Sequence, residues 1–395
     1  MEPDEILDPN SLERWLESRN QSDGIIIATR AAQRVLPLWS PDLRQDLRRI
    51  LEVTALQILR ELLTSGVAAV SPSPEIKAAS IAAFTVANAT AYAAPSTPGT
   101  YAAAAADAAA ATAAAQPGAA YSSTVAKAAA AAYSAAAFDD ASSFWKQIQV
   151  DASAIENGLG PLHTPLWSDL APDWFTQTDG IDRAIWQTQD PAHWSFWQRW
   201  WDGVISGRQI EWALQEKIAL IPDEDWKAGP KKDGLTPEAR IAKRIEVIEE
   251  IFRLQEEVAA LKREFSWVAL RPATPEHRAH NNPPEVLSAE VEAHREIVIL
   301  LRTLDDADEE LAKPDPSPPL LRRFGLALIE IARRIASYCV TLGDIAARKA
   351  ADQIGETAVK WGVRYLVATM ASQTEPVRTV GQELVKLANQ ILGGG

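Results

Sequence analysis

The fold is decided by residues 237–265, which read PEARIAKRIEVIEEIFRLQEEVAALKREF. Apolar residues recur there in steps of four, three, four, three and four: Val247, Ile251, Leu254, Val258, Leu261 and Phe265. This spacing is typical of a helix whose heptad seam packs against another helix. A second stripe, Ile241, Ile245, Ile248 and Phe252, widens the apolar face beyond that of a two-stranded coil. We predict a long helix and an interface for self-association or for a protein partner, formed by Val247, Ile251, Leu254, Val258 and Leu261.

A proline-containing segment, residues 271–284, follows this helix and is expected to turn the chain. Residues 285–311 return with helical spacing of their apolar residues, so an antiparallel helical hairpin is expected. Residues 313–319 read KPDPSPP, a composition that forbids a helix and is typical of a stiff linker. Beyond this linker the periodicity predicts three amphipathic helices that form a C-terminal bundle.

The N-terminal part is also helical in pattern, because strand-like alternation is almost absent. Within residues 102–115, twelve of fourteen residues are alanine, which has the highest helix propensity. These helices are expected to pack closely, although a low-complexity segment that orders only on assembly is the alternative. We predict an all-α protein with three modules: 1–144 with the Ala-rich helices, 145–312 with a Trp-rich part and the long hairpin, and 320–395 as a basic bundle.

Residues 145–226 contain ten of the fourteen tryptophans. Trp194, Trp197 and Trp201 are spaced i, i+3 and i+7, so they share one helix face. An aromatic wall of this kind, with Arg208 nearby, can bind a cation or a ring-shaped ligand. The same residues can equally form the core of the module, since tryptophan buries a large area. We favour the core and keep ligand binding as the alternative.

Charge and composition limit the partners. The formal net charge is −14, which argues against nucleic acid as a partner for the whole surface. Residues 320–395 contain ten Lys or Arg against six Asp or Glu, a net of +4, so an anionic membrane surface is conceivable there. The single cysteine, Cys339, allows no disulfide within the chain, and no apolar run is long enough for a membrane helix. We expect a cytoplasmic protein.

Sequence motifs for chemistry are missing. There is no phosphate loop, dinucleotide fingerprint, His-Glu-x-x-His or nucleophile elbow. His277 and His280 could supply two metal ligands, but a solvated turn is the better interpretation. Asp223, Glu224 and Asp225 are better explained as a helix cap than as an acid–base group. We therefore predict no catalytic residue, metal or cofactor.

The Trp-rich part resembles a segment shared by uncharacterised bacterial helical proteins. The residues that carry the resemblance are Trp194-x-x-Trp197-x-x-Trp200-Trp201-Asp202, then Gly207-Arg208, then ALIPDEDWKAG at residues 219–229. Those proteins also tend to carry Ala-rich tracts upstream and a Pro-x-Trp-Phe stretch such as residues 172–175. The resemblance covers about residues 60–260. It implies an N-terminal module joined to a varying C-terminal one, and no activity.

The sequence thus predicts a non-catalytic helical scaffold or adaptor that self-associates, as a homo-oligomer, or binds protein partners. A membrane-active effector working through the basic helices of residues 320–395 is the alternative. An enzyme with a Trp-lined site comes third.

Overall fold

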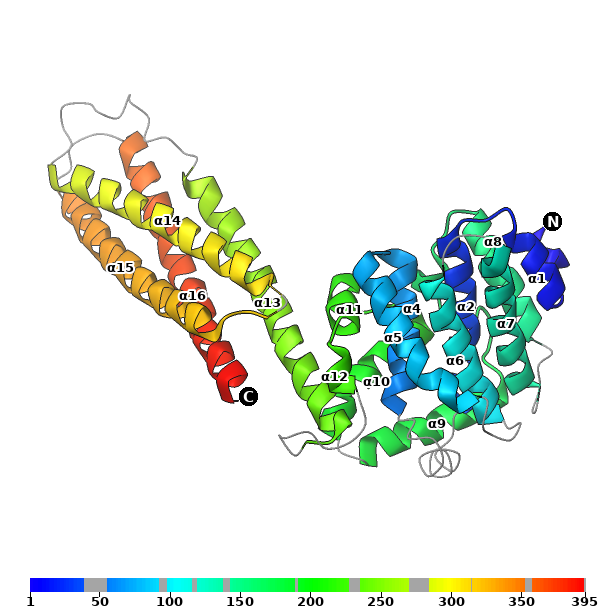
Figure 1. Cartoon of the computed structure of the whole chain (residues 1–395). Coiled ribbons are helices and arrows are strands. Elements are labelled where there is room, and N and C mark those ends of the chain that lie inside the picture. Colours follow the sequence, from blue (N-terminus) through cyan, green and yellow to red (C-terminus); the bar gives the residue numbers. More distant parts are fainter. Residues whose placement is uncertain are drawn as a thin grey trace. The chain divides into compact units, whose positions relative to one another are not determined.

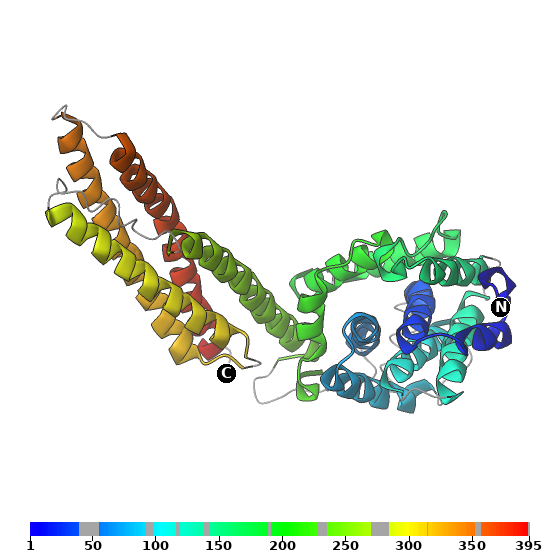
Figure 2. The same ribbon diagram turned by 90° about the horizontal axis from the view of Figure 1, so that it is seen from above.

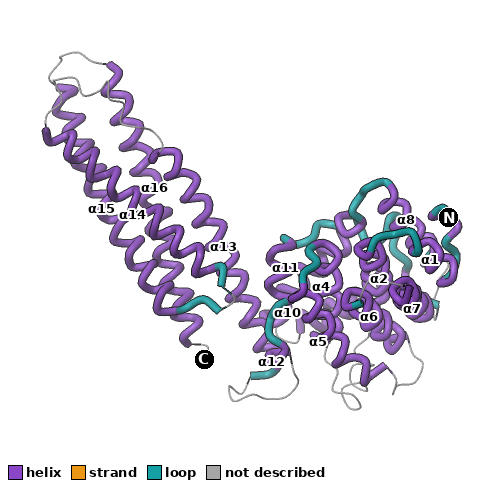
Figure 3. Tube along the Cα trace, turned by 45° about the horizontal axis from the view of Figure 1, so that its top comes forward, coloured by secondary structure: helices purple, strands orange, loops and turns teal. Residues whose placement is uncertain are grey.

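The computed structural model describes residues 1–38, 55–91, 98–115, 119–137, 143–188, 191–226, 235–269, 284–313, 315–351 and 357–393. Within these ranges every regular element is a helix, and Figure 3 shows helices and loops only. The all-α class predicted from the sequence is confirmed.

The chain divides into two compact units, residues 1–246 (unit 1) and 247–395 (unit 2). The boundary lies inside one long helix, α13 (Pro237–Ala269), and not at the proline-rich linker. This differs from the three expected modules. The reason is that the apolar seam of α13 shares a core with the C-terminal helices, so the hairpin groups with them and not with the Trp-rich part.

Unit 1 contains short and medium helices (Figure 1). Their bounds are η1 (Pro3–Glu5), α1 (Pro9–Leu16), α2 (Gln21–Val35), η2 (Leu36–Leu38), α4 (Ala55–Val70), α5 (Pro74–Ala91), α6 (Pro98–Ala114), α7 (Ala119–Ala136), α8 (Phe144–Glu156), η3 (Pro161–His163), α9 (Asp173–Thr188), α10 (Pro191–Ser206), α11 (Trp212–Ala219) and α12 (Asp223–Trp226). In Figure 2 the green segment that carries the Trp-rich helices runs along one side of the blue and cyan helices.

Helix α2 is the centre of unit 1 and packs against α4, α6, α7 and α8. It begins at an Asn20 cap, whose side chain accepts a hydrogen bond from the Asp23 backbone N–H at 2.9 Å. Gly24 lies in its first turn because the Tyr121 ring of α7 packs there: a Cβ at this position would come within 2.7 Å of Tyr121 Cζ. The Tyr121 hydroxyl donates to the Gln21 carbonyl oxygen.

The Ala-rich segments form helices α6 and α7, as the sequence predicts. These two helices pack against each other, and the alanines that face inward are fully buried: Ala105, Ala106, Ala109 and Ala110 on α6, and Ala128, Ala129 and Ala132 on α7. Because most of these buried side chains are methyl groups, the helices can approach closely while burying little apolar area per residue.

Unit 2 contains the remainder of α13 together with α14 (Pro284–Leu311), α15 (Pro318–Ala351) and α16 (Thr357–Gly393), which run side by side in Figure 1. All four helices contribute to one apolar core. The second and third of the expected C-terminal helices form a single helix, α16, which continues through Pro376. Proline removes one helical hydrogen bond. The buried Val377 and Val380 on the next turn hold the helix against the core.

Helices α15 and α16 approach each other closely at a pair of glycines. A Cβ at Gly325 would come within 2.5 Å of the Gly381 carbonyl oxygen, and a Cβ at Gly381 within 2.7 Å of the Gly325 carbonyl oxygen. Two glycines therefore face each other where these helices cross. In the described part of the chain, no helix is both long enough and apolar enough to cross a membrane.

Candidate functional site

The three tryptophans proposed as a ligand wall lie on α10 and are buried. Trp194, Trp197 and Trp201 are 3%, 0% and 1% exposed. The Trp201 indole N–H donates to Asp179 Oδ1 at 2.7 Å, which fixes the ring against α9. Arg208, by contrast, is exposed. The rings thus fill the core of unit 1, the role that we favoured, whereas a cation cage needs an open ring face.

Aromatic packing around Trp197 explains why this segment is so rich in tryptophan. Its ring centroid lies 5.1 Å from Phe196, 5.9 Å from Trp200 and 6.3 Å from Trp226, each in an edge-to-face arrangement. Edge-to-face pairs at these distances are favourable beyond the area that they bury. The Trp-rich helix and the ALIPDEDW segment are therefore parts of one core.

Gly207 has a structural role in the same region. Its φ is 73°, in the left-handed region that favours glycine. A Cβ there would also come within 2.6 Å of the Pro165 backbone nitrogen. The chain can therefore reverse direction after α10 and lie directly against the loop at residues 161–168.

The acidic cluster after Pro222 forms α12 and makes ion pairs with basic helix residues. Asp223 pairs with Arg60 of α4, and the Arg60 guanidinium lies 5.0 Å from the Trp226 ring centroid. Asp225 Oδ2 lies 3.1 Å from Arg244 Nε of α13. These carboxylates connect α12 to α4 and to the start of α13, as structural groups.

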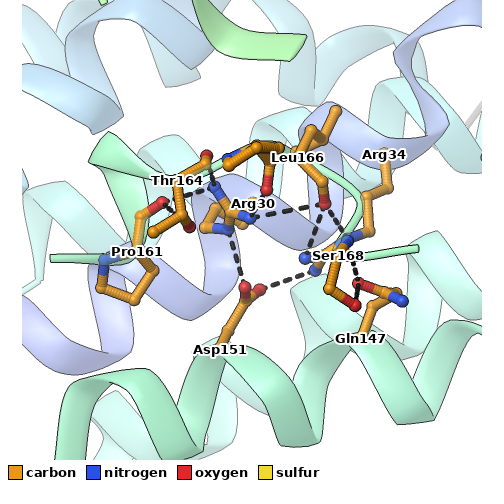
Figure 4. A network of polar contacts seen from close by, with 9 residues as sticks. Arg30, Arg34, Gln147, Asp151, Pro161, Thr164, Leu166 and Ser168 are labelled. Carbon is orange, nitrogen blue, oxygen red and sulfur yellow. Dashed lines mark hydrogen bonds and ion pairs between the residues drawn. The ribbon is translucent and has the colours of Figure 1, made fainter. Parts of the chain in front are cut away.

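A buried network of two arginines and one aspartate, which the sequence reasoning did not predict, joins α2 to α8 (Figure 4). Arg30 Nε donates to Asp151 Oδ1 at 2.8 Å, and Arg34 Nη1 lies 2.7 Å from Asp151 Oδ2. All three side chains are at most 3% exposed. Burial lowers the pKa of Arg30, and the Asp151 carboxylate opposes that shift.

The remaining arginine donors hold the loop at residues 161–168 through its backbone. Arg30 donates to the carbonyl oxygens of Pro161 at 2.6 Å and Pro165 at 2.7 Å, and Arg34 Nη2 donates to that of Leu166 at 3.0 Å. The loop therefore has its carbonyl groups paired inside the protein, where water could not pair them. The network is a structural centre that holds two helices and a loop together.

A second group of buried acidic side chains lies on α4 and α6. Glu61 is 0% exposed and Asp107 is 8% exposed. No group in the described ranges donates a hydrogen bond to either Glu61 carboxylate oxygen or to Asp107 Oδ1. Burial, together with the neighbouring Asp107 carboxylate, raises the pKa of Glu61 well above its ordinary value. Burial raises the pKa of Asp107 to about 7.

The proposed interface residues lie in the core of unit 2. Ile251, Leu254, Val258 and Leu261 are buried, and Val247 packs against the same core. Helices α14, α15 and α16 of the same chain cover this seam. As a surface for a second copy, the seam is therefore unavailable in the folded bundle. The sequence pattern predicted this apolar face, and in the structure three helices of the same chain cover it.

Metal binding through histidine finds no support in the described residues. His277 and His280 lie outside the described ranges, and so does the side chain of His294. Among the residues that the structure describes, no group of three or more His, Cys, Asp or Glu side chains could hold a metal ion.

Comparison with known proteins yields no relative: no family model, curated protein or solved structure matches the chain significantly.

Proposed function

We propose that the chain is a non-catalytic helical adaptor that associates with a second copy of itself or with a protein partner. The observation that carries this proposal is the division into two compact helical units within one chain. Two such units offer two separate surfaces. The residues that most resemble catalytic groups, the α10 tryptophans and the acids of α12, are occupied by packing and ion pairs.

The surface that we propose for self-association is the C-terminal half of the second stripe of α13, Ile248 and Phe252, because Ile241 and Ile245 of that stripe are buried. Ile248 and Phe252 are only half-buried, unlike the seam residues one turn away. A large aromatic ring that stays partly exposed loses apolar hydration when a partner covers it. Association through this stripe leaves the core of unit 2 intact, whereas association through the seam would require the bundle to open.

Light scattering of the full chain between 1 and 100 µM tests this proposal. We expect a mass above that of the 43.0 kDa monomer. The Phe252→Asp variant should have the mass of a monomer. The Ala260→Asp variant, which adds the same charge at an exposed position of α13, should keep the larger mass. A monomer at every concentration would contradict self-association. Leu254→Asp is unsuitable here because it would unfold the bundle by burying a charge.

The membrane-active effector is the weaker proposal, because two of the basic residues of α15 are paired with glutamates. Arg333 and Arg334 both pair with Glu330, at 2.8 and 3.1 Å, and Arg334 also lies 3.4 Å from Glu296. The apolar face of α15 is turned into the core. Sedimentation of the full chain with anionic and neutral vesicles separates the two proposals. Salt-sensitive binding to anionic vesicles alone would favour the effector.

A further inference from the structure

Among the buried oxygen atoms of unit 1 that accept no hydrogen bond from any described group, four lie on the neighbouring helices α4 and α6. They are Gln57 Oε1, both carboxylate oxygens of Glu61, and Asp107 Oδ1. Each belongs to a side chain that is 8% exposed or less. A buried acceptor without a donor costs about 1–3 kcal/mol, so several together require a compensating positive charge or donor.

Helix geometry places these atoms together. Gln57 and Glu61 are one turn apart on α4, so their side chains lie on the same face. Helices α4 and α6 pack directly against each other. Asp107 is the only charged residue among the alanines of α6, and its carboxylate acts electrostatically on Glu61. The Glu61 and Asp107 carboxylates therefore interact between α4 and α6, and the Gln57 amide lies one turn from Glu61 on the same face of α4.

The cation next to Glu61 in the sequence, Arg60, has another ion-pair partner. Arg60 opposes the rise in the pKa of Glu61, but its guanidinium pairs with Asp223 and lies over the Trp226 ring. Arg30 and Arg34 of α2 are committed to Asp151 and to the loop carbonyls. The two carboxylates thus carry up to two negative charges without a matching described side chain.

We propose that Gln57, Glu61 and Asp107 bind a divalent cation between α4 and α6. The donors are all hard oxygen atoms, the type that Ca²⁺ and Mg²⁺ prefer over nitrogen or sulfur. A divalent ion balances the two carboxylates, whereas a monovalent ion leaves one negative charge buried. Binding cross-links α4 to the alanine-rich helix α6. The cation is therefore a structural ligand of unit 1.

Thermal unfolding of the full chain, followed by tryptophan fluorescence, tests the proposal. The protein is first treated with EDTA, dialysed, and then titrated with CaCl₂ or MgCl₂ against KCl of equal ionic strength. At 100 times the dissociation constant, we expect the melting temperature to rise by about 5–10 °C. Isothermal titration calorimetry should give one site per chain.

Two variants and a control assign the site. Glu61→Gln and Asp107→Asn keep the side-chain shape and should each weaken binding at least tenfold. Glu75→Gln, at an exposed position on α5, should bind as the unaltered protein does. Asp107→Asn also provides the test if Glu61→Gln does not fold. The proposal is overturned if neither ion raises the melting temperature, or if both variants respond as the control does. If low pH stabilises the protein and neither ion does, these carboxylates hold a proton and not a cation, and the proposal is overturned.

Discussion

Replacement of Asp151 by alanine should destabilise unit 1 strongly. In the structure this carboxylate is shared by Arg30 and Arg34, at 2.8 and 2.7 Å, and none of the three side chains is more than 3% exposed. Asp151→Ala leaves two buried guanidinium groups without a counter-charge. Breaking a buried ion pair by removing one partner typically costs about 3–5 kcal/mol. Both arginines keep their backbone carbonyl acceptors. We therefore expect the free energy of unfolding to fall by an amount within this range, and not by the sum of the costs of two broken ion pairs.

Urea unfolding followed by tryptophan fluorescence is a suitable assay, since twelve of the fourteen tryptophans lie in residues 1–246. Asp169→Ala is the matched control: Asp169 pairs with Lys146 at 3.2 Å, but both side chains are 65% exposed. Exposed pairs contribute about 0–1 kcal/mol. If Asp151→Ala costs no more than Asp169→Ala, the network does not hold unit 1 together, and the reasoning from burial is wrong.

Three further predictions concern other parts of the fold. Trp197→Ala should lower the free energy of unfolding by about 3–5 kcal/mol, measured in urea, while the exposed Ser195→Ala should change it by less than about 0.5 kcal/mol. Gly381→Ala should destabilise unit 2 by about 1–3 kcal/mol in thermal unfolding followed by circular dichroism, because its Cβ meets the Gly325 carbonyl oxygen. The pKa of Asp107 is raised from 3.8 to about 7 in the folded state, so the folded state holds its proton more tightly. In EDTA, the contribution of Asp107 to stability should therefore be fully present below about pH 4 and decrease by at most about 4 kcal/mol as the pH rises to 7, and the difference in stability between the unaltered protein and Asp107→Asn should follow this change.

The sequence was sufficient for the fold class and for most of the helices. The heptad seam of residues 247–265 predicted an apolar face, and the structure buries that face. Periodicity shows which side of a helix is apolar, but it contains no information about which helix covers that side. Helices α14, α15 and α16 supply that cover from within the chain, so the expected intermolecular interface became an internal core.

The buried charges escaped the sequence reasoning for a different reason. Hydrophobic patterning treats charged residues as surface residues, which is correct for most of them. Two local signals could have identified the exceptions. Glu61 lies next to Arg60 between leucines, in the segment LRELL at residues 59–63. Asp107 is the single charged residue in an alanine-rich helix. A charge that falls where the pattern demands an apolar residue must be paired, protonated or bound to a ligand.

The two units differ in how their cores specify one arrangement of helices. In unit 2 the described core is formed by branched and aromatic side chains, with Glu296 and Glu310 as the buried charges. Such side chains interdigitate, and their shapes fix the register between helices. Unit 1 has large side chains in its core as well, but its helices α6 and α7 have smooth alanine faces, and methyl groups distinguish one register from the next only weakly. Its buried charges, among them Arg30, Asp151 and Glu61, can pair or bind an ion in one register alone. We therefore expect the near-ultraviolet circular dichroism of the core tryptophans to weaken in Asp151→Ala before helical content is lost, because register fails before the helices do.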